Sequence, residues 1–160
     1  MKYFVCFVIV FAMLFTTSCS SELVEKSFEV NEFSITLDSS FKDKDASGAY
    51  AYFISRNYLI VCIKESFSEL PSEYADFSEE KYAEVVSVSN EKSQDCLKNE
   101  DGYYYLEYTN KAEKKEYYYN SFIKKGESAF YIVTFTAEVQ EDNSLYHTQF
   151  KAWMDTVSVS

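Results

Sequence analysis

The sequence predicts a single α+β domain that follows a short N-terminal leader, and three observations predict it. Several segments alternate apolar and polar residues with period two, as strands with one buried face do. Two segments, about 78–90 and 142–155, place apolar residues at helical spacing. The 142 residues from 19 to 160 are a typical single-domain length, and no repeat, low-complexity tract or linker divides them.

The first strands are predicted as two antiparallel pairs. Apolar residues alternate over about 27–31 and again over 33–38, and Asn31 lies in the turn between the two segments. A polar loop then leads into a second hairpin, with arms over about 49–54 and 58–64. Asn57 suits the turn of this hairpin because asparagine tolerates a positive φ. The second arm is almost continuously apolar, which indicates a central strand.

A helix is predicted from about 78 to 90, after a loop that Pro71 closes. Ser78 suits the N-cap position, and Glu79 and Glu80 follow in the first turn, where negative charge is favourable. The apolar face that we expect to lie against a sheet consists of Tyr82, Val85, Val86 and Ser89.

The second half is predicted as a long hairpin, a central strand and a closing helix. A turn over 99–102 leads into antiparallel arms over 103–109 and 116–124, and the aromatic and β-branched residues of 128–137 indicate a central strand. The closing helix runs from 141 or 142 to 155, with Asp142 or Asn143 as its cap, and a short extended tail follows it. Its apolar stripe consists of Tyr146, Phe150 and Trp153, widened by Leu145 and Met154.

These apolar patterns resemble a known family. The resemblance rests on the alternating Phe33, Ile35 and Leu37, the late strand 130–137, and the closing Phe150, Met154, Val157 and Val159. They look like the PsbP-like domains of many small bacterial lipoproteins, over about residues 28–159. The resemblance implies a mostly antiparallel sheet of about six strands flanked by helices, arranged as an α/β/α sandwich. It carries over no functional residue.

The leader, residues 1–18, has the pattern of an export signal. Lys2 is its only charge, and the apolar run 3–15 is shorter than the roughly 20 residues that cross a bilayer. Thr16, Thr17 and Ser18 precede Cys19, and this tetrad resembles the lipobox of bacterial lipoproteins. The resemblance implies that Cys19 receives diacylglycerol and becomes the first residue, so that 19–26 is a tether and 27–160 the domain. An ordinary cleaved signal and an uncleaved anchor are the alternatives.

The charge of the chain limits what it binds. Without Lys2 the chain has 14 basic and 26 acidic residues, a net charge of −12. Nucleic acid binding requires lysine and arginine to displace counterions from phosphates, so nucleic acid is not an expected partner. The same charge disfavours adsorption to anionic lipid headgroups. We therefore expect the link to the membrane to be covalent, through Cys19.

The cysteines and the single histidine indicate no metal site. Cys62 and Cys96 are the two cysteines left to pair outside the cytosol, and either they form a disulfide or Cys62 is a buried thiol within the apolar run 59–63. A structural zinc site takes four cysteine or histidine ligands, which the chain does not supply at suitable spacing. His147, the one histidine, is expected to face solvent from the closing helix.

No catalytic or cofactor motif is visible. The sequence has no glycine pattern around a serine that would indicate a nucleophile, and three isolated glycines do not form a phosphate-binding loop. We therefore predict no catalytic residue, no cofactor and no metal ligand.

Tyrosines are the most distinctive side chains, because seven of them lie in the two arms of the long hairpin. A platform for a glycan or peptide is one interpretation, since tyrosine offers a large contact area and a hydrogen-bonding tip at low entropy cost. The alternative is that helices cover both faces and the rings are packing residues. The candidate contact residues are Tyr103, Tyr105, Tyr117 and Tyr119.

The function class that fits best is a non-catalytic binding or accessory lipoprotein on the extracytoplasmic side of the cell membrane. Its expected partners are the membrane, through the anchor, and an envelope protein or a glycan or peptide ligand. The alternative is a structural or scaffolding subunit of an envelope protein complex. Either function requires only an anchor, a rigid domain and a recognition surface.

Overall fold

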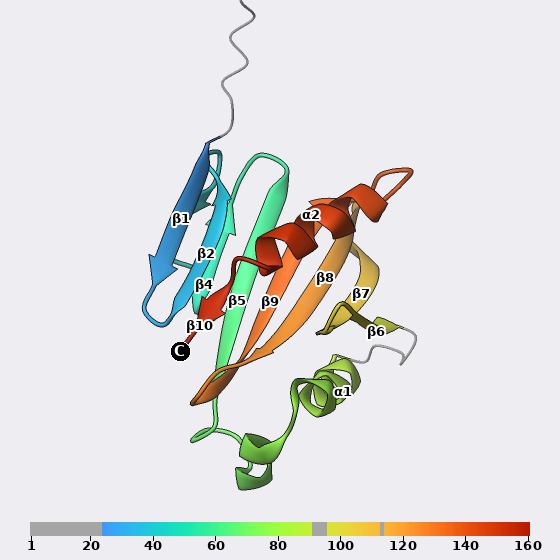
Figure 1. Ribbon diagram of the computed structural model, residues 1–160. Coiled ribbons are helices and arrows are strands. Elements are labelled where there is room, and N and C mark those ends of the chain that lie inside the picture. The colour runs from blue at the N-terminus through green and yellow to red at the C-terminus, as the bar shows by residue number, and fades with distance from the viewer. Residues whose placement is uncertain (1–23, 91–95, 113) are drawn as a thin grey trace, which may run out of the picture.

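The structure is a computed structural model that describes residues 24–90, 96–112 and 114–160. Within these ranges the chain forms a seven-stranded sheet, a three-stranded sheet and two α-helices (Figure 1). The predicted α+β class with a mostly antiparallel sheet is confirmed, although the large sheet has seven strands where about six were expected. The leader and Cys19 lie outside the described residues.

The large sheet is antiparallel throughout. Its strands, in spatial order, are β3 (Lys42–Asp43), β4 (Ala51–Ile54), β5 (Tyr58–Ser66), β9 (Ala129–Glu138), β8 (Lys115–Lys125), β7 (Tyr103–Ala112) and β6 (Leu97–Glu100). β5 and β9, which were both predicted to be central, pair with each other over nine residues in the middle of the sheet.

The small sheet consists of β1 (Glu25–Val30), β2 (Phe33–Asp38) and β10 (Ser158–Val159). The turn between β1 and β2 lies where it was predicted, and Asn31 adopts a φ of 53° there. The predicted C-terminal tail is a strand, because Val159 pairs with Phe33 of β2. Both ends of the domain are thus fastened to the same strand.

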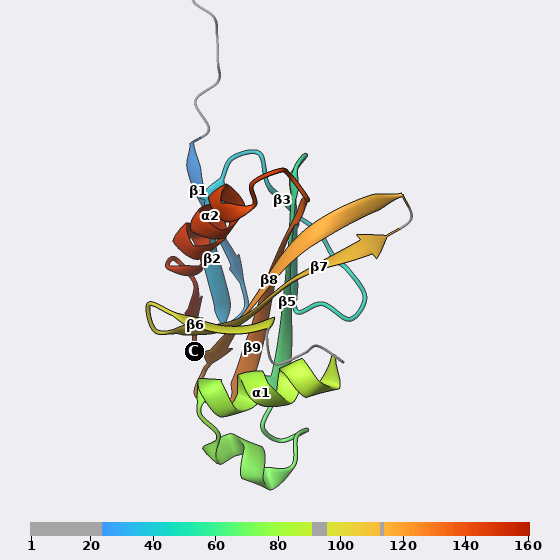
Figure 2. The ribbon, with the colours of Figure 1, turned by 90° about the vertical axis from the view of Figure 1, so that its right-hand side faces the viewer.

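The two faces of the large sheet are covered differently. Its front face includes Phe53, Ile60 and Phe135, and both α2 (Ser144–Met154) and the small sheet pack on it (Figure 1). Its back face carries the opposite side chains, among them Leu106 and Ile123. There α1 (Glu79–Ser89) packs on β6, β7 and β8 at one end of the sheet (Figure 2). The result is an α/β/α arrangement with an incomplete back layer.

Both helices begin near the predicted residues. The Ser78 hydroxyl caps α1 by accepting a hydrogen bond from the backbone N–H of Lys81 at 3.2 Å. The buried face of α1 is rotated slightly from the prediction, since its buried residues are Tyr82, Ala83, Val86 and Ser87. In α2 the expected stripe is buried at Phe150, Trp153 and Met154. Leu145, which was expected to widen it, is 74 % exposed.

Three local features differ from the prediction. The polar segment before the long hairpin forms a strand, β6, and a short 3-10 helix, η1 (Ser72–Asp76), follows Pro71. Asn57 is not among the residues with positive φ, whereas Asp101 has a φ of 50° in the β6–β7 turn. Edge strands and single helical turns bury few side chains, so they leave little periodicity in the sequence.

Candidate functional site

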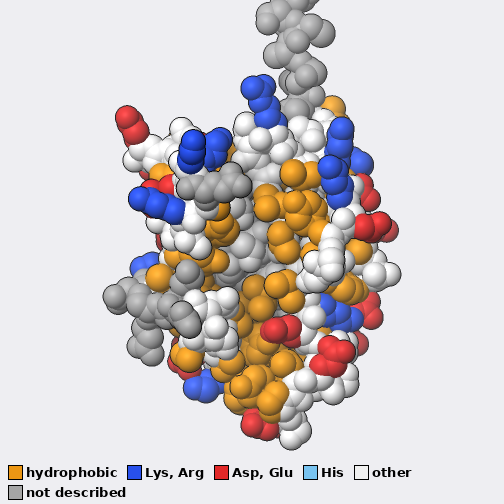
Figure 3. All heavy atoms as spheres, turned by 180° about the vertical axis from the view of Figure 1, so that it is seen from behind, with side chains coloured by type: hydrophobic (Ala, Val, Ile, Leu, Met, Phe, Trp, Pro, Cys, Tyr) orange, Lys and Arg blue, Asp and Glu red, His pale blue; other side chains and the backbone are white. Residues whose placement is uncertain are grey.

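The back face of the large sheet is open over β4 and β5, where most side chains are apolar or aromatic and Ile63 of β5 is 40 % exposed. On the neighbouring β9, Phe130 and Ile132 are buried and the other back-face side chains are the polar Thr134 and Thr136. Viewed from behind, hydrophobic side chains form a continuous band along this face (Figure 3). Soluble domains rarely leave a contiguous apolar surface of this kind without a use for it, so the open back face is the candidate site.

One end of the open back face is hollowed. The hollow has a volume of about 550 Å³, within the range typical of ligand sites. The strand register places its floor residues side by side in one row across four strands. These residues are Ile54 of β4, Leu59 of β5, Thr136 of β9 and Tyr119 of β8. The floor is therefore built on strands, which hold its shape.

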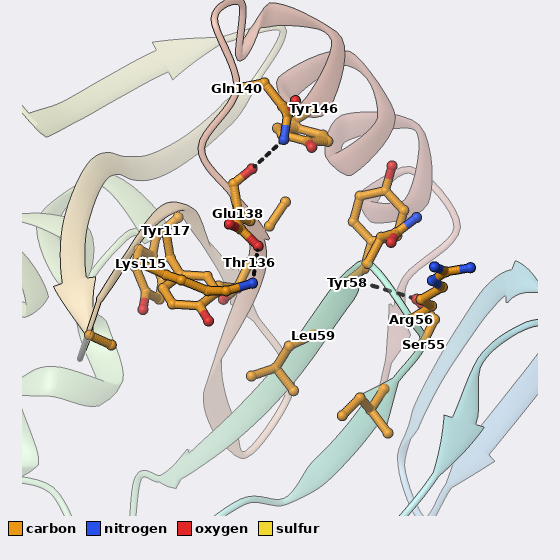
Figure 4. A pocket seen from close by; sticks show the side chains of 15 residues that line it. Ser55, Arg56, Tyr58, Leu59, Lys115, Tyr117, Thr136, Glu138, Gln140 and Tyr146 are labelled. Atoms are coloured by element: carbon orange, nitrogen blue, oxygen red, sulfur yellow. Dashed lines mark hydrogen bonds and ion pairs between the residues drawn. The ribbon is translucent and has the colours of Figure 1, made fainter.

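Charged and polar side chains surround this floor. Arg56 lies at the tip of the β4–β5 turn and Lys115 at the start of β8, on opposite sides of the hollow (Figure 4). Lys115 forms an ion pair with Glu138, at 2.6 Å between Nζ and Oε2. Gln140 and Asn57 complete the rim. An apolar floor with a polar rim is the usual composition of a protein recognition surface.

Aromatic contacts hold two tyrosines of the hollow, Tyr119 and Tyr58, in place. Tyr119 stacks on Tyr108 with a centroid separation of 5.0 Å and an interplanar angle of 7°. Burial, followed by the neighbouring Tyr108 and Tyr117, raises the pKa of Tyr119. The phenol therefore stays protonated at neutral pH. Tyr58 closes the end of the hollow, where its ring meets Tyr146 edge-on at 5.9 Å.

The structure does not bring the four candidate tyrosines together. Tyr105 pairs with Phe122 and Tyr108 pairs with Tyr119, so Tyr103 and Tyr105 lie on the front face. Tyr117 and Tyr119 lie on the back face and line the hollow. The four tyrosines therefore do not form one platform. In this register, odd-numbered residues of β7 share a face with even-numbered residues of β8, so the odd-numbered tyrosines of the two strands lie on opposite faces.

The two front-face tyrosines are packing residues with bonded hydroxyls. Tyr105 is 3 % exposed, and its ring stacks on Phe122 at 4.9 Å. Burial, together with the nearby Glu100, raises the pKa of Tyr105. Tyr103 donates a hydrogen bond to Asp155 Oδ1 at 2.8 Å, and burial aided by that carboxylate raises its pKa to about 12. The expectation that helices cover the rings holds for this face.

His147 is more enclosed than the sequence suggested, since its side chain is only 18 % exposed. The imidazole stacks on Tyr105 at 5.2 Å, and its Nδ1 lies 2.8 Å from Oδ1 of the buried Asn120. An amide oxygen only accepts, so Nδ1 carries the hydrogen. Nε2 lies 3.4 Å from Glu100 Oε2, a separation that becomes an ion pair when the ring is protonated. The prediction that His147 faces solvent was therefore wrong.

No disulfide joins Cys62 to Cys96 in the part of the chain that the structure describes. Cys62 lies on β5 and Cys96 just before β6, with β9, β8 and β7 between those strands. Four strand spacings of about 4.8 Å separate the two by roughly 19 Å, whereas a disulfide needs Cα atoms within about 7 Å. Burial raises the pKa of the Cys62 thiol to about 12. Cys62 is therefore a core residue, the second of the two alternatives.

Two kinds of feature are absent from the described residues. No group of three or more histidine, cysteine, aspartate or glutamate side chains within them is arranged to hold a metal ion. None of their helices is both long and apolar enough to cross a membrane.

The chain resembles solved structures in fold only. No family model matches it, and no curated protein does. The cyanobacterial PsbP protein CyanoP from Synechocystis superimposes with a TM-score of 0.52 at 15 % identity, over 91 % of this chain and 99 % of that one. The yeast Ran-binding protein Mog1p superimposes with a TM-score of 0.54 at 8 % identity, over 86 % and 96 %. The expected PsbP-like fold is confirmed.

Two further structures extend this comparison. LpqN, involved in cell envelope biogenesis of Mycobacterium tuberculosis, has a TM-score of 0.50 at 10 % identity, over 87 % of this chain and 92 % of that one. A protein from Bacteroides thetaiotaomicron has a TM-score of 0.51 at 14 % identity, over 85 % of this chain. The present chain spans only 48 % of the length of that protein.

Proposed function

We propose that this chain is a lipoprotein attached through Cys19 to the extracytoplasmic side of the cell membrane, with a non-catalytic domain that binds a protein partner. The partner docks on the open back face, with the hollow between Arg56 and Lys115 at one end of the contact. Tyr117 and Tyr119 are the contact residues retained from the sequence analysis. Tyr103 and Tyr105 are not part of this surface.

The observation that carries the proposal is the uncovered apolar band on β4 and β5. A site for a small ligand is a cleft of limited extent, lined by apolar side chains and a few precisely placed polar groups. Here the apolar surface continues past the hollow along β5, through the partly exposed Val61 to the exposed Ile63. A surface of that length and composition fits a protein partner better than a glycan.

The fold neighbours support a binding function without identifying the partner. Mog1p is named as a Ran-binding protein, and LpqN is described as involved in cell envelope biogenesis. This architecture therefore occurs both in a protein that binds another protein and in one that serves the envelope. The lipobox-like tetrad before Cys19 supports the anchor, and two acyl chains are sufficient for stable membrane attachment.

The anchor is tested by Cys19→Ala in the native host. The variant should appear in the soluble fraction and should no longer incorporate a fatty-acid probe, since the thiol that carries the lipid is gone. Ser20→Ala is the matched control and should remain on the membrane. Retention of both membrane attachment and label by Cys19→Ala would refute the anchor.

The docking face is tested by placing a charge on it. Ile63→Asp should reduce co-purification of the chain's membrane partner at least tenfold, because an aspartate buried in an apolar contact loses its hydration. Val88→Asp, on the exposed side of α1, is the control. Equal recovery of the partner with both variants, each shown to be folded by circular dichroism, would exclude the open back face as the docking surface.

A further inference from the structure

The two ends of the domain differ in charge. At one end of the domain lie the start of β1, the β4–β5 and β7–β8 turns and the loop before α2 (Figures 1 and 2). The sequence of this anchor end, in segments 24–26, 38–44, 55–57, 111–116 and 138–143, contains seven basic and eight acidic residues. The anchor end thus has a net charge of only −1 in a chain of net charge −11.

The opposite end is strongly acidic. It consists of the end of β5, η1 and α1 (Figure 2). Between residues 65 and 84 the only basic side chain is Lys81, which pairs with Glu84. The acidic side chains there are Glu65, Glu69, Glu73, Asp76, Glu79, Glu80 and Glu84. The β8–β9 turn at this end adds Lys124, Lys125 and Glu127, and Lys125 donates to the backbone carbonyls of Ala75 and Phe77. These segments together have eight acidic and three basic side chains, a net charge of −5.

The chain leaves the domain at the anchor end, which is the less acidic of the two. Four residues lie between Cys19 and Val24, the first described residue, and the five Cα–Cα steps between the two span at most about 18 Å when fully extended. Arg56, Lys111 and Lys114 are exposed in the two turns at the same end. If Cys19 is acylated, these cations are held close to the lipid headgroups.

We propose that an anionic lipid surface orients the domain. The β4–β5 and β7–β8 turns face the headgroups, and the α1 end points away from them. β5 alone spans about 30 Å, three times the Debye length at 0.1 M salt. The electrostatic potential of the lipid surface is therefore much weaker at the α1 end than at the anchor end. The open back face then runs outward from the membrane surface, where a membrane-bound partner can reach it. This orientation rests on the proposed anchor.

The net negative charge of the chain disfavours contact with anionic headgroups. The proposed orientation reduces this repulsion because it keeps the acidic end away from the lipid surface. The anchor supplies the affinity, while the charge distribution determines which end approaches the headgroups. Lys115 contributes little to this surface because it is paired with Glu138. Of the six other cations at this end, Arg56, Lys111 and Lys114 lie in or beside the two turns that face the headgroups.

The test measures energy transfer from the lipidated full chain to a headgroup acceptor in vesicles with 30 % phosphatidylglycerol. A donor dye is attached at Asn57→Cys, at the anchor end, or at Ser68→Cys, at the acidic end, each in a Cys96→Ser background. Cys62 is buried with a raised thiol pKa, so it does not compete for the dye. We expect at least twofold stronger transfer from position 57 than from position 68. This difference should disappear in neutral phosphatidylcholine vesicles and in 0.5 M salt.

Matched variants separate charge from other causes. Arg56→Gln, Lys111→Gln and Lys114→Gln together should remove the difference in transfer. Ser72→Glu, Ser89→Glu and Asn99→Glu lower the net charge by the same three units at exposed positions remote from the anchor end, and should keep it. Equal transfer from positions 57 and 68 with wild-type charges, or a difference that persists in neutral vesicles, would overturn the orientation. Failure of the chain to float with any vesicles would instead refute the anchor.

Discussion

The front and back faces of the large sheet are built from the same strands, yet only the front face is closed. β8 shows the contrast within three residues, because Tyr118 is buried beneath α2 whereas Tyr117 and Tyr119 line the open hollow. On the front face, phenols are fixed by neighbours, as when Tyr118 donates to Glu107 at 2.7 Å. The number of aromatic residues on a face therefore does not show whether that face binds a partner. What distinguishes the two faces is whether a helix or a second sheet covers them.

The largest expected effect compares two isoleucines of β5. Ile60 is fully buried on the front face and Ile63 is 40 % exposed on the back face. Ile60→Ala should lower the free energy of unfolding by about 2–5 kcal/mol, because it removes transfer energy and leaves a cavity. Ile63→Ala should cost less than about 1 kcal/mol. Urea denaturation measures both, and equal losses would mean that the back face is covered.

The next effect concerns the polar contact beneath α2. His147→Ala leaves the fully buried Asn120 side chain without its 2.8 Å partner, which should cost about 1–3 kcal/mol of stability. Thr148→Ala, at the neighbouring exposed position of α2, should change stability by no more than about 0.5 kcal/mol. A thermal melt of each variant is sufficient. An unchanged midpoint for His147→Ala would show that the imidazole is not part of the front packing.

A smaller effect appears at alkaline pH. Burial is the main reason why the pKa of Tyr103 is raised to about 12. Burial also raises the pKa of Tyr105 and of Tyr118. Folding thus favours the protonated phenols, so their contribution is complete below the unfolded pKa of about 10 and is lost as pH rises toward the folded value. Stability measured by urea denaturation should fall between pH 10 and 12. Tyr118→Phe should flatten this decline, and an identical slope would contradict it.

The smallest effect is expected at the rim of the hollow. Lys115 and Glu138 form an ion pair in which both side chains are about half exposed, so Lys115→Ala should cost less than about 1 kcal/mol. The loss should shrink further in 0.5 M salt, because screening weakens exposed pairs. A cost above 2 kcal/mol in chemical denaturation would indicate that the rim is a structural element and not an accessible edge.

The sequence predicted most of the fold because the central elements carry strong periodic patterns. The β5 and β9 strands were recognised by their apolar runs, and α1 by its Ser78 cap. The pairing of the short tail with β2 was not recognisable, since Val157 and Val159 alone specify no partner. The β6 strand was missed because three of its four residues are exposed, so its sequence has no alternation of apolar and polar residues.

The candidate site was predicted only in part. The alternation of side chains correctly separated the tyrosines within each arm. Which tyrosines of the two arms share a face depends on the register between the arms, and a shift of one residue would exchange the faces of one arm. Tyr105 and Tyr119 were therefore grouped although they lie on opposite faces. His147 gave no signal, because its partners Asn120 and Glu100 are distant in sequence.

The most direct test of the central claim is photo-crosslinking in native membranes, with a photoreactive amino acid at single positions. Ile63 and Tyr119 on the open back face should each give one discrete adduct of the same size. Val88 on α1 and Leu145 on α2, which are both more exposed than Ile63, should give none. Adducts at Val88 or Leu145 together with silence at Ile63 and Tyr119 would contradict the account, because the partner would then bind elsewhere.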